Sequence, residues 1–170
     1  PFVKVGTNTL VVVADTRRHR SRWYPGAGLT RKVVLRTLPK THFSYNGIAV
    51  TTPVVTPARA TVRVAWTAES APVDETVDVT LTLDETTVAS GTASVTAGSL
   101  ELAVENPQLW DVTNAVLYRA TCTLGAARET VRFGIRTIAF PVAEDPSDRA
   151  ANGFHLNGRR VELKGVNLHE

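Results

Sequence analysis

The sequence predicts an all-β fold: an antiparallel two-sheet β-sandwich with a β-hairpin at the carboxyl end. Three observations predict it. Apolar and polar residues alternate with a period of two in a series of short segments across residues 48–140. Turn residues separate these segments, and no stretch shows a convincing helical period. Short alternating strands at this spacing are typical of a two-sheet sandwich of about seven strands.

The strands of the predicted sandwich follow from the alternation. A turn is expected at Asn46-Gly47, before the first strand. The inward positions supply a core, and Tyr118 is placed to form a tyrosine-corner hydrogen bond with the preceding loop. The predicted strands are residues 48–55, 59–69, 76–83, 88–90, 99–105, 116–124 and 128–140. The predicted core includes Trp66, Leu81, Leu102, Tyr118 and Phe133.

The amino-terminal part differs in pattern from the sandwich. Residues 8–15 and 29–38 read as strands that are apolar on both faces, so each is expected to be buried in a sheet. Two such strands do not make a domain. We therefore expect their sheet partners to precede Pro1 in a longer protein.

The carboxyl-terminal part reads as a hairpin followed by a short strand. Residues 141–152 form a polar linker, and Asn157-Gly158 favours a type I′ turn. Val161 and Leu163 alternate with polar residues on the return strand, and the run 166–168 ends in His169 and Glu170. A strand that carries His and Glu to its carboxyl end is typical of the first strand of a catalytic barrel. The chain is therefore expected to be a segment of a larger enzyme.

Composition restricts the possible classes. Hydrophobic residues make up 43% and charged residues 21% of the 170 residues, which favours a packed core over disorder. No apolar run approaches the length of a membrane span, so no membrane partner is expected. The single Cys122 cannot form an internal disulfide and is expected to be buried.

Nucleic-acid binding is disfavoured, because the net charge is only +3. A loop with four arginines and a histidine, residues 17–22, precedes Trp23 and Tyr24 and could form a basic patch with stacking aromatics. We favour a solvated loop there.

Several motifs occur in an order that resembles a known family. They read NPQLW at 106–110, FGIR at 133–136, FHLNG at 154–158 and KGVNLHE at 164–170. On the amino-terminal side they read GTNTL at 6–10 and WYPGAGLTR at 23–31. This set resembles glycoside hydrolase family 2, which contains β-galactosidases, β-glucuronidases and β-mannosidases. The resemblance covers nearly the whole chain.

The resemblance implies three segments. Residues 1–41 would be the end of a sugar-binding jelly-roll domain. Residues 46–140 would be the immunoglobulin-like sandwich, and residues 143–170 would be the entry hairpin and first strand of a (β/α)₈ barrel. The family cleaves terminal β-glycosides with retention by means of two glutamates. Both lie on later barrel strands, so the chain is expected to contain no catalytic residue and to be inactive alone.

The resemblance also implies one substrate-binding residue. His169 matches a position that contacts the sugar in β-galactosidase-like members. The alternative is a histidine that only orders neighbouring strand ends. Asn167 and Glu170 are expected to be structural. No metal ligands are expected, because the four histidines show no ligand spacing; Mg²⁺ or Na⁺ would be used only by the parent enzyme.

The leading hypothesis is an accessory segment of a β-galactosidase-like enzyme that acts on terminal β-D-galactosides. A β-glucuronidase or β-mannosidase parent is an alternative, and so is a non-catalytic carbohydrate-binding or adhesion module. The expected partners are the rest of its own chain and the carbohydrate substrate of the parent. Assembly into a homo-oligomer is left open.

Overall fold

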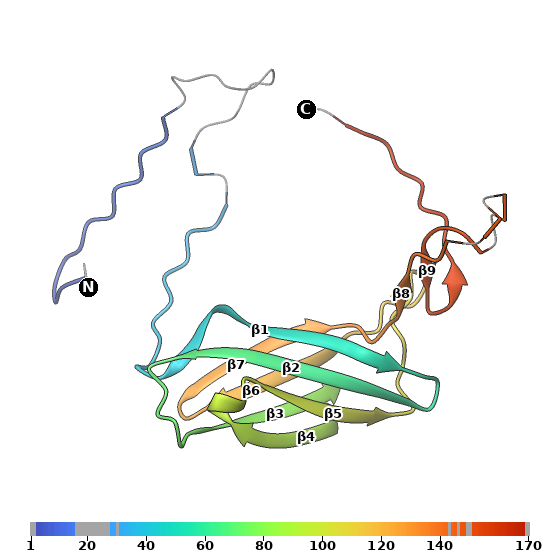
Figure 1. The fold of residues 1–170 in the computed structure, drawn as a ribbon. Coiled ribbons are helices and arrows are strands. Elements are labelled where there is room, and N and C mark those ends of the chain that lie inside the picture. Colours follow the sequence, from blue (N-terminus) through green and yellow to red (C-terminus); the bar gives the residue numbers. More distant parts are fainter. Residues whose placement is uncertain are drawn as a thin grey trace. The chain divides into compact units, whose positions relative to one another are not determined.

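The computed structural model describes residues 3–15, 28–29, 31–142, 144–145, 147–148 and 151–168 (Figure 1). By its internal contacts the chain divides into two units, Pro1–Thr37 and Leu38–Glu170. Each unit is described by itself.

The amino-terminal unit contains no strand within residues 3–15, 28–29 and 31–37. The prediction of buried strands at 8–15 and 29–38 is therefore wrong for this chain. Leu10 is 81% exposed and Val33 is 70% exposed. A strand that is apolar on both faces needs neighbouring strands at its edges and packed layers above and below. The described residues of this unit provide neither. The predicted basic loop, residues 17–22, lies outside the described residues.

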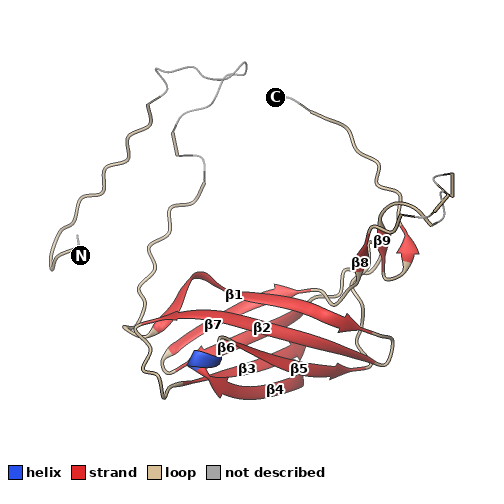
Figure 2. Ribbon diagram, viewed as in Figure 1, coloured by secondary structure: helices blue, strands red, loops and turns tan. Residues whose placement is uncertain are grey.

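The second unit is built around two antiparallel sheets packed face to face (Figures 1 and 2). The first sheet has the order β1-β2-β5 and consists of β1 (His42–Val55), β2 (Arg59–Glu69) and β5 (Ser99–Glu105). The second has the order β4-β3-β6-β7 and consists of β3 (Thr76–Leu83), β4 (Thr86–Ser94), β6 (Tyr118–Leu124) and β7 (Ala127–Phe133). These seven strands form the predicted immunoglobulin-like sandwich.

The core lies between the inner faces of the two sheets. The predicted core residues Trp66, Leu81, Tyr118 and Phe133 are buried there, and Leu102 is half-buried and packs against them. The indole Nε1 of Trp66 donates to the Val95 carbonyl (2.9 Å), so this buried donor is satisfied. Cys122 is fully buried, and burial raises the pKa of its thiol to about 11. It therefore packs as a neutral apolar group, as expected.

The tyrosine corner is confirmed. The Tyr118 hydroxyl accepts a hydrogen bond from the Gln108 backbone N–H (2.8 Å). Burial raises the pKa of this phenol, and the hydrogen bond from Gln108 partly opposes that shift. The contact fixes the loop that connects β5 to β6 against the start of β6. The same loop carries Trp110 and Asp111.

Several strand boundaries differ from the predictions. β4 spans the whole of Thr86–Ser94 instead of 88–90. Its last residue caps η1 (Val95–Ala97), a single 3₁₀ turn in which the Ser94 hydroxyl accepts from the Thr96 N–H. The predicted strand 128–140 is broken, because β7 ends at Phe133 and residues 134–137 leave the sheet.

The expected turn at Asn46-Gly47 is instead an irregularity inside β1, where the register against β2 shifts between Phe43 and Ile48. A Cβ atom on Gly47 would lie 2.7 Å from the Ser44 carbonyl oxygen and 2.8 Å from that of Thr67. Only glycine permits this close approach of backbones, so β1 continues through the bulge.

A small third sheet comes after the sandwich. It has the order β10-β9-β8 and consists of β8 (Ile138–Ala139), β9 (His155–Leu156) and β10 (Arg159–Arg160). The predicted hairpin is confirmed, with Asn157 at φ 52° and Gly158 at φ 74°. The return strand is shorter than predicted: Leu163 is 73% exposed, and residues 161–168 contain no strand. Beyond the Val161 N–H, which donates to the Phe154 carbonyl, no strand among the described residues pairs with that segment. No helix in the described part of the chain is long and apolar enough to cross a membrane.

Leu81 provides a test of the register of the sandwich. Leu81→Ala should lower the free energy of unfolding by about 2–5 kcal/mol, because it removes a fully buried side chain and leaves a cavity. Thr67→Ala, at an exposed position of β2, is the matched control and should change it by less than about 0.5 kcal/mol. Urea denaturation measures both. Equal midpoints for the two variants would show that Leu81 does not face the core.

Candidate functional site

Of Asn167, His169 and Glu170, only Asn167 belongs to the described residues, so the sugar contact of His169 stays a prediction. His169 and Glu170 lie outside the described residues. Asn167 is exposed and makes no hydrogen bond to another described residue.

The carboxyl groups with a displaced pKa do not indicate an acid catalyst. In Asp145 the hydrogen bonds from Ser147 lower the pKa of the carboxyl group. The pKa of Asp111 is lowered as well. A lowered pKa is the opposite of what a general acid needs.

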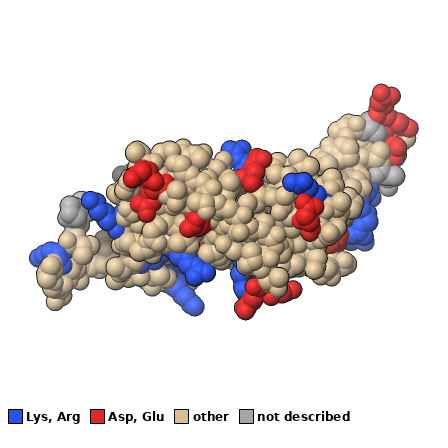
Figure 3. Space-filling view, turned by 90° about the horizontal axis from the view of Figure 1, so that it is seen from below, with Lys and Arg blue, Asp and Glu red and all other residues tan. Residues whose placement is uncertain are grey.

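The described residues show no metal-binding cluster, and the face drawn in Figure 3 shows no strongly charged patch. The described residues contain no cluster of three or more His, Cys, Asp or Glu side chains that could hold a metal ion. On the face drawn in Figure 3, basic and acidic side chains are interspersed. Such a surface lacks the concentrated basic footprint of a nucleic-acid-binding domain.

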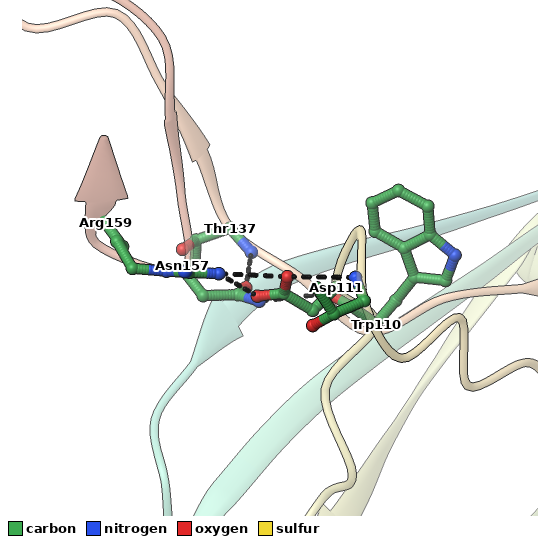
Figure 4. Close-up of polar contacts among 6 residues, drawn as sticks. Trp110, Asp111, Thr137, Asn157 and Arg159 are labelled. Carbon is green, nitrogen blue, oxygen red and sulfur yellow. Dashed lines mark hydrogen bonds and ion pairs between the residues drawn. The ribbon is translucent and has the colours of Figure 1, made fainter. Parts of the chain in front are cut away.

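Contacts between distant segments are concentrated instead where the sandwich meets the terminal hairpin. Three segments that are distant in the sequence meet there (Figure 4). They are the β5–β6 loop at Trp110 and Asp111, the segment after β7 at 134–137, and the hairpin turn at 157–159. We call this set the junction.

The first layer of the junction is Trp110 against the segment after β7. The Trp110 backbone N–H donates to the Ile135 carbonyl (2.9 Å). A Cβ atom on Gly134 would lie 2.7 Å from the Trp110 Cβ and 2.8 Å from its Cγ, so glycine is required for this approach. The Arg136 guanidinium carbon lies 5.0 Å from the centre of a Trp110 ring, within the range of a cation–π contact. Trp110 thus anchors the β5–β6 loop to the segment after β7.

The second layer is the Asn157 side chain, which bridges two other segments. Its Oδ1 accepts from the Thr137 backbone N–H (3.0 Å), and its Nδ2 donates to the Trp110 carbonyl (2.9 Å). The Asn157 backbone N–H also donates to the Thr137 carbonyl (3.0 Å). One residue therefore ties the turn both to the segment after β7 and to the β5–β6 loop (Figure 4).

The third layer is the ion pair between Arg159 and Asp111. The Arg159 Nη2 lies 3.0 Å from each oxygen of the Asp111 carboxylate. Burial alone would raise the pKa of Asp111, but the hydrogen bond from Arg159 and further hydrogen bonds from the Thr113 and Val112 backbone lower it. The carboxylate therefore stays ionised and holds the guanidinium of the return strand.

Apolar contacts complete the junction. Leu156 is 1% exposed and pairs with Ile138 across β8 and β9. The ring centres of Phe140 and Phe154 lie 5.3 Å apart. Within the described part of the chain, no buried side-chain nitrogen or oxygen lacks a hydrogen-bond partner. The buried polar side-chain atoms of the junction are therefore all hydrogen-bonded.

The sequence identified the turn at Asn157-Gly158 but missed the bridging role of the Asn157 side chain. It also missed the pairing of Asp111 with Arg159, because 48 residues separate the two and no local pattern connects them. The one available signal was that asparagine, unlike glycine, brings an amide to the left-handed position of a turn.

Comparisons with known proteins identify the class. The sequence profile described as "Glycosyl hydrolases family 2" matches residues 41–136, which is more than half of the chain. The chain belongs to this family.

Individual relatives were found as well. Over 177 residues the chain is 30% identical to a Formosa agariphila protein named "Putative beta-glucuronidase", a match that covers 99% of the chain and 16% of that protein. Over 179 residues it is 31% identical to a β-galactosidase of Bacteroides ovatus, a match that covers 95% of the chain and 20% of that protein. The chain thus spans a fifth or less of the length of these relatives.

Solved structures share the fold. A glycosyl hydrolase family 2 member from Bacteroides cellulosilyticus superposes with a TM-score of 0.62 at 30% identity, over 74% of this chain and 18% of that one. An FMN-binding β-glucuronidase from Faecalibacterium prausnitzii superposes with a TM-score of 0.65 over 76% of this chain and 20% of that one. The latter likeness, at 22% identity, bears on the fold alone.

The ion pair predicts how the junction responds to acid. The folded-state pKa of Asp111 lies below its ordinary value of 3.8. The stabilisation of the folded state by the ionised Asp111 carboxylate is therefore complete above that ordinary value. It is lost as the pH falls through the folded-state pKa. Asp111→Asn should lower the free energy of unfolding at neutral pH, and this loss should vanish in strong acid.

Asp74→Asn is the control for this titration, since Asp74 is exposed and pairs with no other described residue. Urea unfolding of both variants and of the unsubstituted chain across the acid range measures the effect. If Asp111→Asn destabilised the chain equally at neutral and acid pH, the stabilising role of the ionised Asp111 carboxylate would be contradicted.

Proposed function

We propose that the chain is a non-catalytic accessory segment of a retaining β-glycosidase whose full-length form hydrolyses terminal β-D-galactosides. The observation that carries the proposal is the family match over residues 41–136, together with 31% identity to a β-galactosidase over 95% of the chain. The sandwich would act as a rigid spacer between a sugar-binding domain and a catalytic barrel.

The proposed layout assigns each part of the chain to one domain of the parent. Residues 1–41 would be the last strands of a jelly roll. Residues 46–140 would be the sandwich, and residues 143–170 would enter the (β/α)₈ barrel. The exposed apolar side chains of Leu10, Val33 and Leu168 support this layout, because such residues would be covered by the neighbouring domains.

The chemistry would lie outside this segment. Retaining hydrolysis needs two carboxyl groups about 5–5.5 Å apart, with one acting as nucleophile and the other as acid and then base. The acid requires a raised pKa, whereas the displaced carboxyl pKa values here, of Asp111 and Asp145, are lowered. His169 is proposed to contact the sugar at the mouth of the barrel. Any Mg²⁺ or Na⁺ would be bound by the parent outside this segment.

A second candidate substrate is a β-D-glucuronide. The relative from Formosa agariphila carries the name of a β-glucuronidase and matches 99% of the chain at 30% identity, close to the identity with the β-galactosidase. The two sugars differ in a carboxylate at C6 and in the orientation of the hydroxyl at C4. Residues of the barrel would therefore determine which of the two sugars the enzyme accepts.

Hydrolysis of a panel of aryl β-glycosides tests the proposal. The panel contains the galactoside, glucuronide, mannoside and glucoside, and it is applied to this chain and to the full-length enzyme. We expect no turnover by the chain and preferred turnover of the galactoside by the full-length enzyme. Preferred cleavage of the glucuronide would show that the full-length enzyme acts on β-D-glucuronides and not on β-D-galactosides. Hydrolysis by the 170-residue chain itself would contradict the accessory role.

A further inference from the structure

We propose that Asn157 is a positioning residue: its side-chain amide couples the hairpin to the sandwich and thereby fixes where the next segment, the start of the catalytic barrel, begins. The proposal rests on the proposed function for its catalytic consequence. The coupling itself concerns only the described residues and can be measured on this chain.

The turn conformation alone does not explain the choice of asparagine. Asn157 and Gly158 both have positive φ, at 52° and 74°, and glycine adopts such angles without the steric cost that a side chain brings. Asparagine at this position adds one amide, and both ends of that amide are used. Its oxygen accepts from the Thr137 N–H at 3.0 Å, and its nitrogen donates to the Trp110 carbonyl at 2.9 Å.

These two bonds connect parts of the molecule that the hairpin cannot hold by itself. The three strands of the small sheet contain two residues each and offer few ladder hydrogen bonds. Thr137 lies a few residues after β7 of the sandwich, and Trp110 is anchored to Ile135 and the sandwich core through its loop. The Asn157 amide therefore links the hairpin to both anchors at once.

The coupling also affects the segment that leaves the hairpin, residues 162–168. The Val161 N–H donates to the Phe154 carbonyl (2.8 Å), which closes the hairpin just before the chain extends through that segment. The direction of the segment is thus set by the hairpin, and the orientation of the hairpin is set by the junction. In the proposed parent, this segment is the first barrel strand. A displacement of about 1 Å at catalytic groups can reduce the rate about a hundredfold.

Another asparagine offers a matched control. Asn106 also has a positive φ, at 48°, and is exposed. Its side chain makes no hydrogen bond to another described residue. Asn157→Gly and Asn106→Gly therefore remove the same amide from positions of similar positive φ, and only the first removes the bridge. Asn157→Asp keeps an acceptor for the Thr137 N–H but places a second oxygen against the Trp110 carbonyl, so it should not restore the bridge.

Hydrogen exchange on this chain tests the coupling. The reporter is the backbone N–H of residue 157, whose bond to the Thr137 carbonyl survives the substitution. We expect Asn157→Gly to lower its protection factor by about 5- to 30-fold, the loss of one or two hydrogen bonds, while protection in β6 is unchanged. Asn106→Gly should leave both unchanged. Equal protection of residue 157 in the two variants would overturn the coupling.

Kinetics of the full-length enzyme test the positioning role, with the aryl glycoside that it hydrolyses fastest. We expect Asn157→Gly to reduce kcat about tenfold with KM nearly constant, and Asn106→Gly to leave both constants unchanged. Lower protection in the chain with an unchanged kcat would overturn the positioning role. If the unsubstituted full-length enzyme cleaved no glycoside, the proposed function and with it the positioning role would fall, and the exchange result would still decide the coupling.

Discussion

The burial of one apolar face of each sheet against the other is the interaction on which the rest of the structure depends. Val79, Leu81, Tyr118 and Cys122 are almost completely excluded from solvent between the sheets. Burial of each large apolar side chain contributes roughly 1.5–3 kcal/mol. Once this contact holds β6 in place, the Tyr118 hydroxyl can fix the β5–β6 loop, and the loop can present Trp110. The junction and the hairpin are therefore consequences of the sandwich core.

The fold could be predicted from the sequence where periodicity reports burial. Alternation in β2, β3 and β6 places the correct side chains inward because each of these strands has one face in the core and one toward solvent. The same reasoning failed at residues 8–15 and 161–168. Apolar character there indicates a need for burial, but pairing depends on neighbouring strands that the described chain does not supply. It also failed at Gly47, where a bulge and a turn share one residue preference.

The junction was harder to foresee than the core. The tyrosine corner was predictable, because Tyr118 lies at the start of a strand in a recurring arrangement. The Asn157 bridge and the Asp111–Arg159 pair depend on three-dimensional proximity between segments that no local pattern connects. The exposure of the Arg159 side chain, 63%, also hides it from any analysis based on hydropathy. The motifs along the chain indicate its family, whereas these contacts exist only in the folded structure.

We infer that the sandwich and the hairpin form one rigid body through the junction. Backbone ¹⁵N relaxation of this chain tests it most directly. We expect order parameters of about 0.85 for the amides of residues 156–160, equal to those of β6. Values below about 0.6 at the hairpin, with β6 still rigid, would contradict the claim. The hairpin would then move freely on a tether, and the junction could not set the direction of residues 162–168.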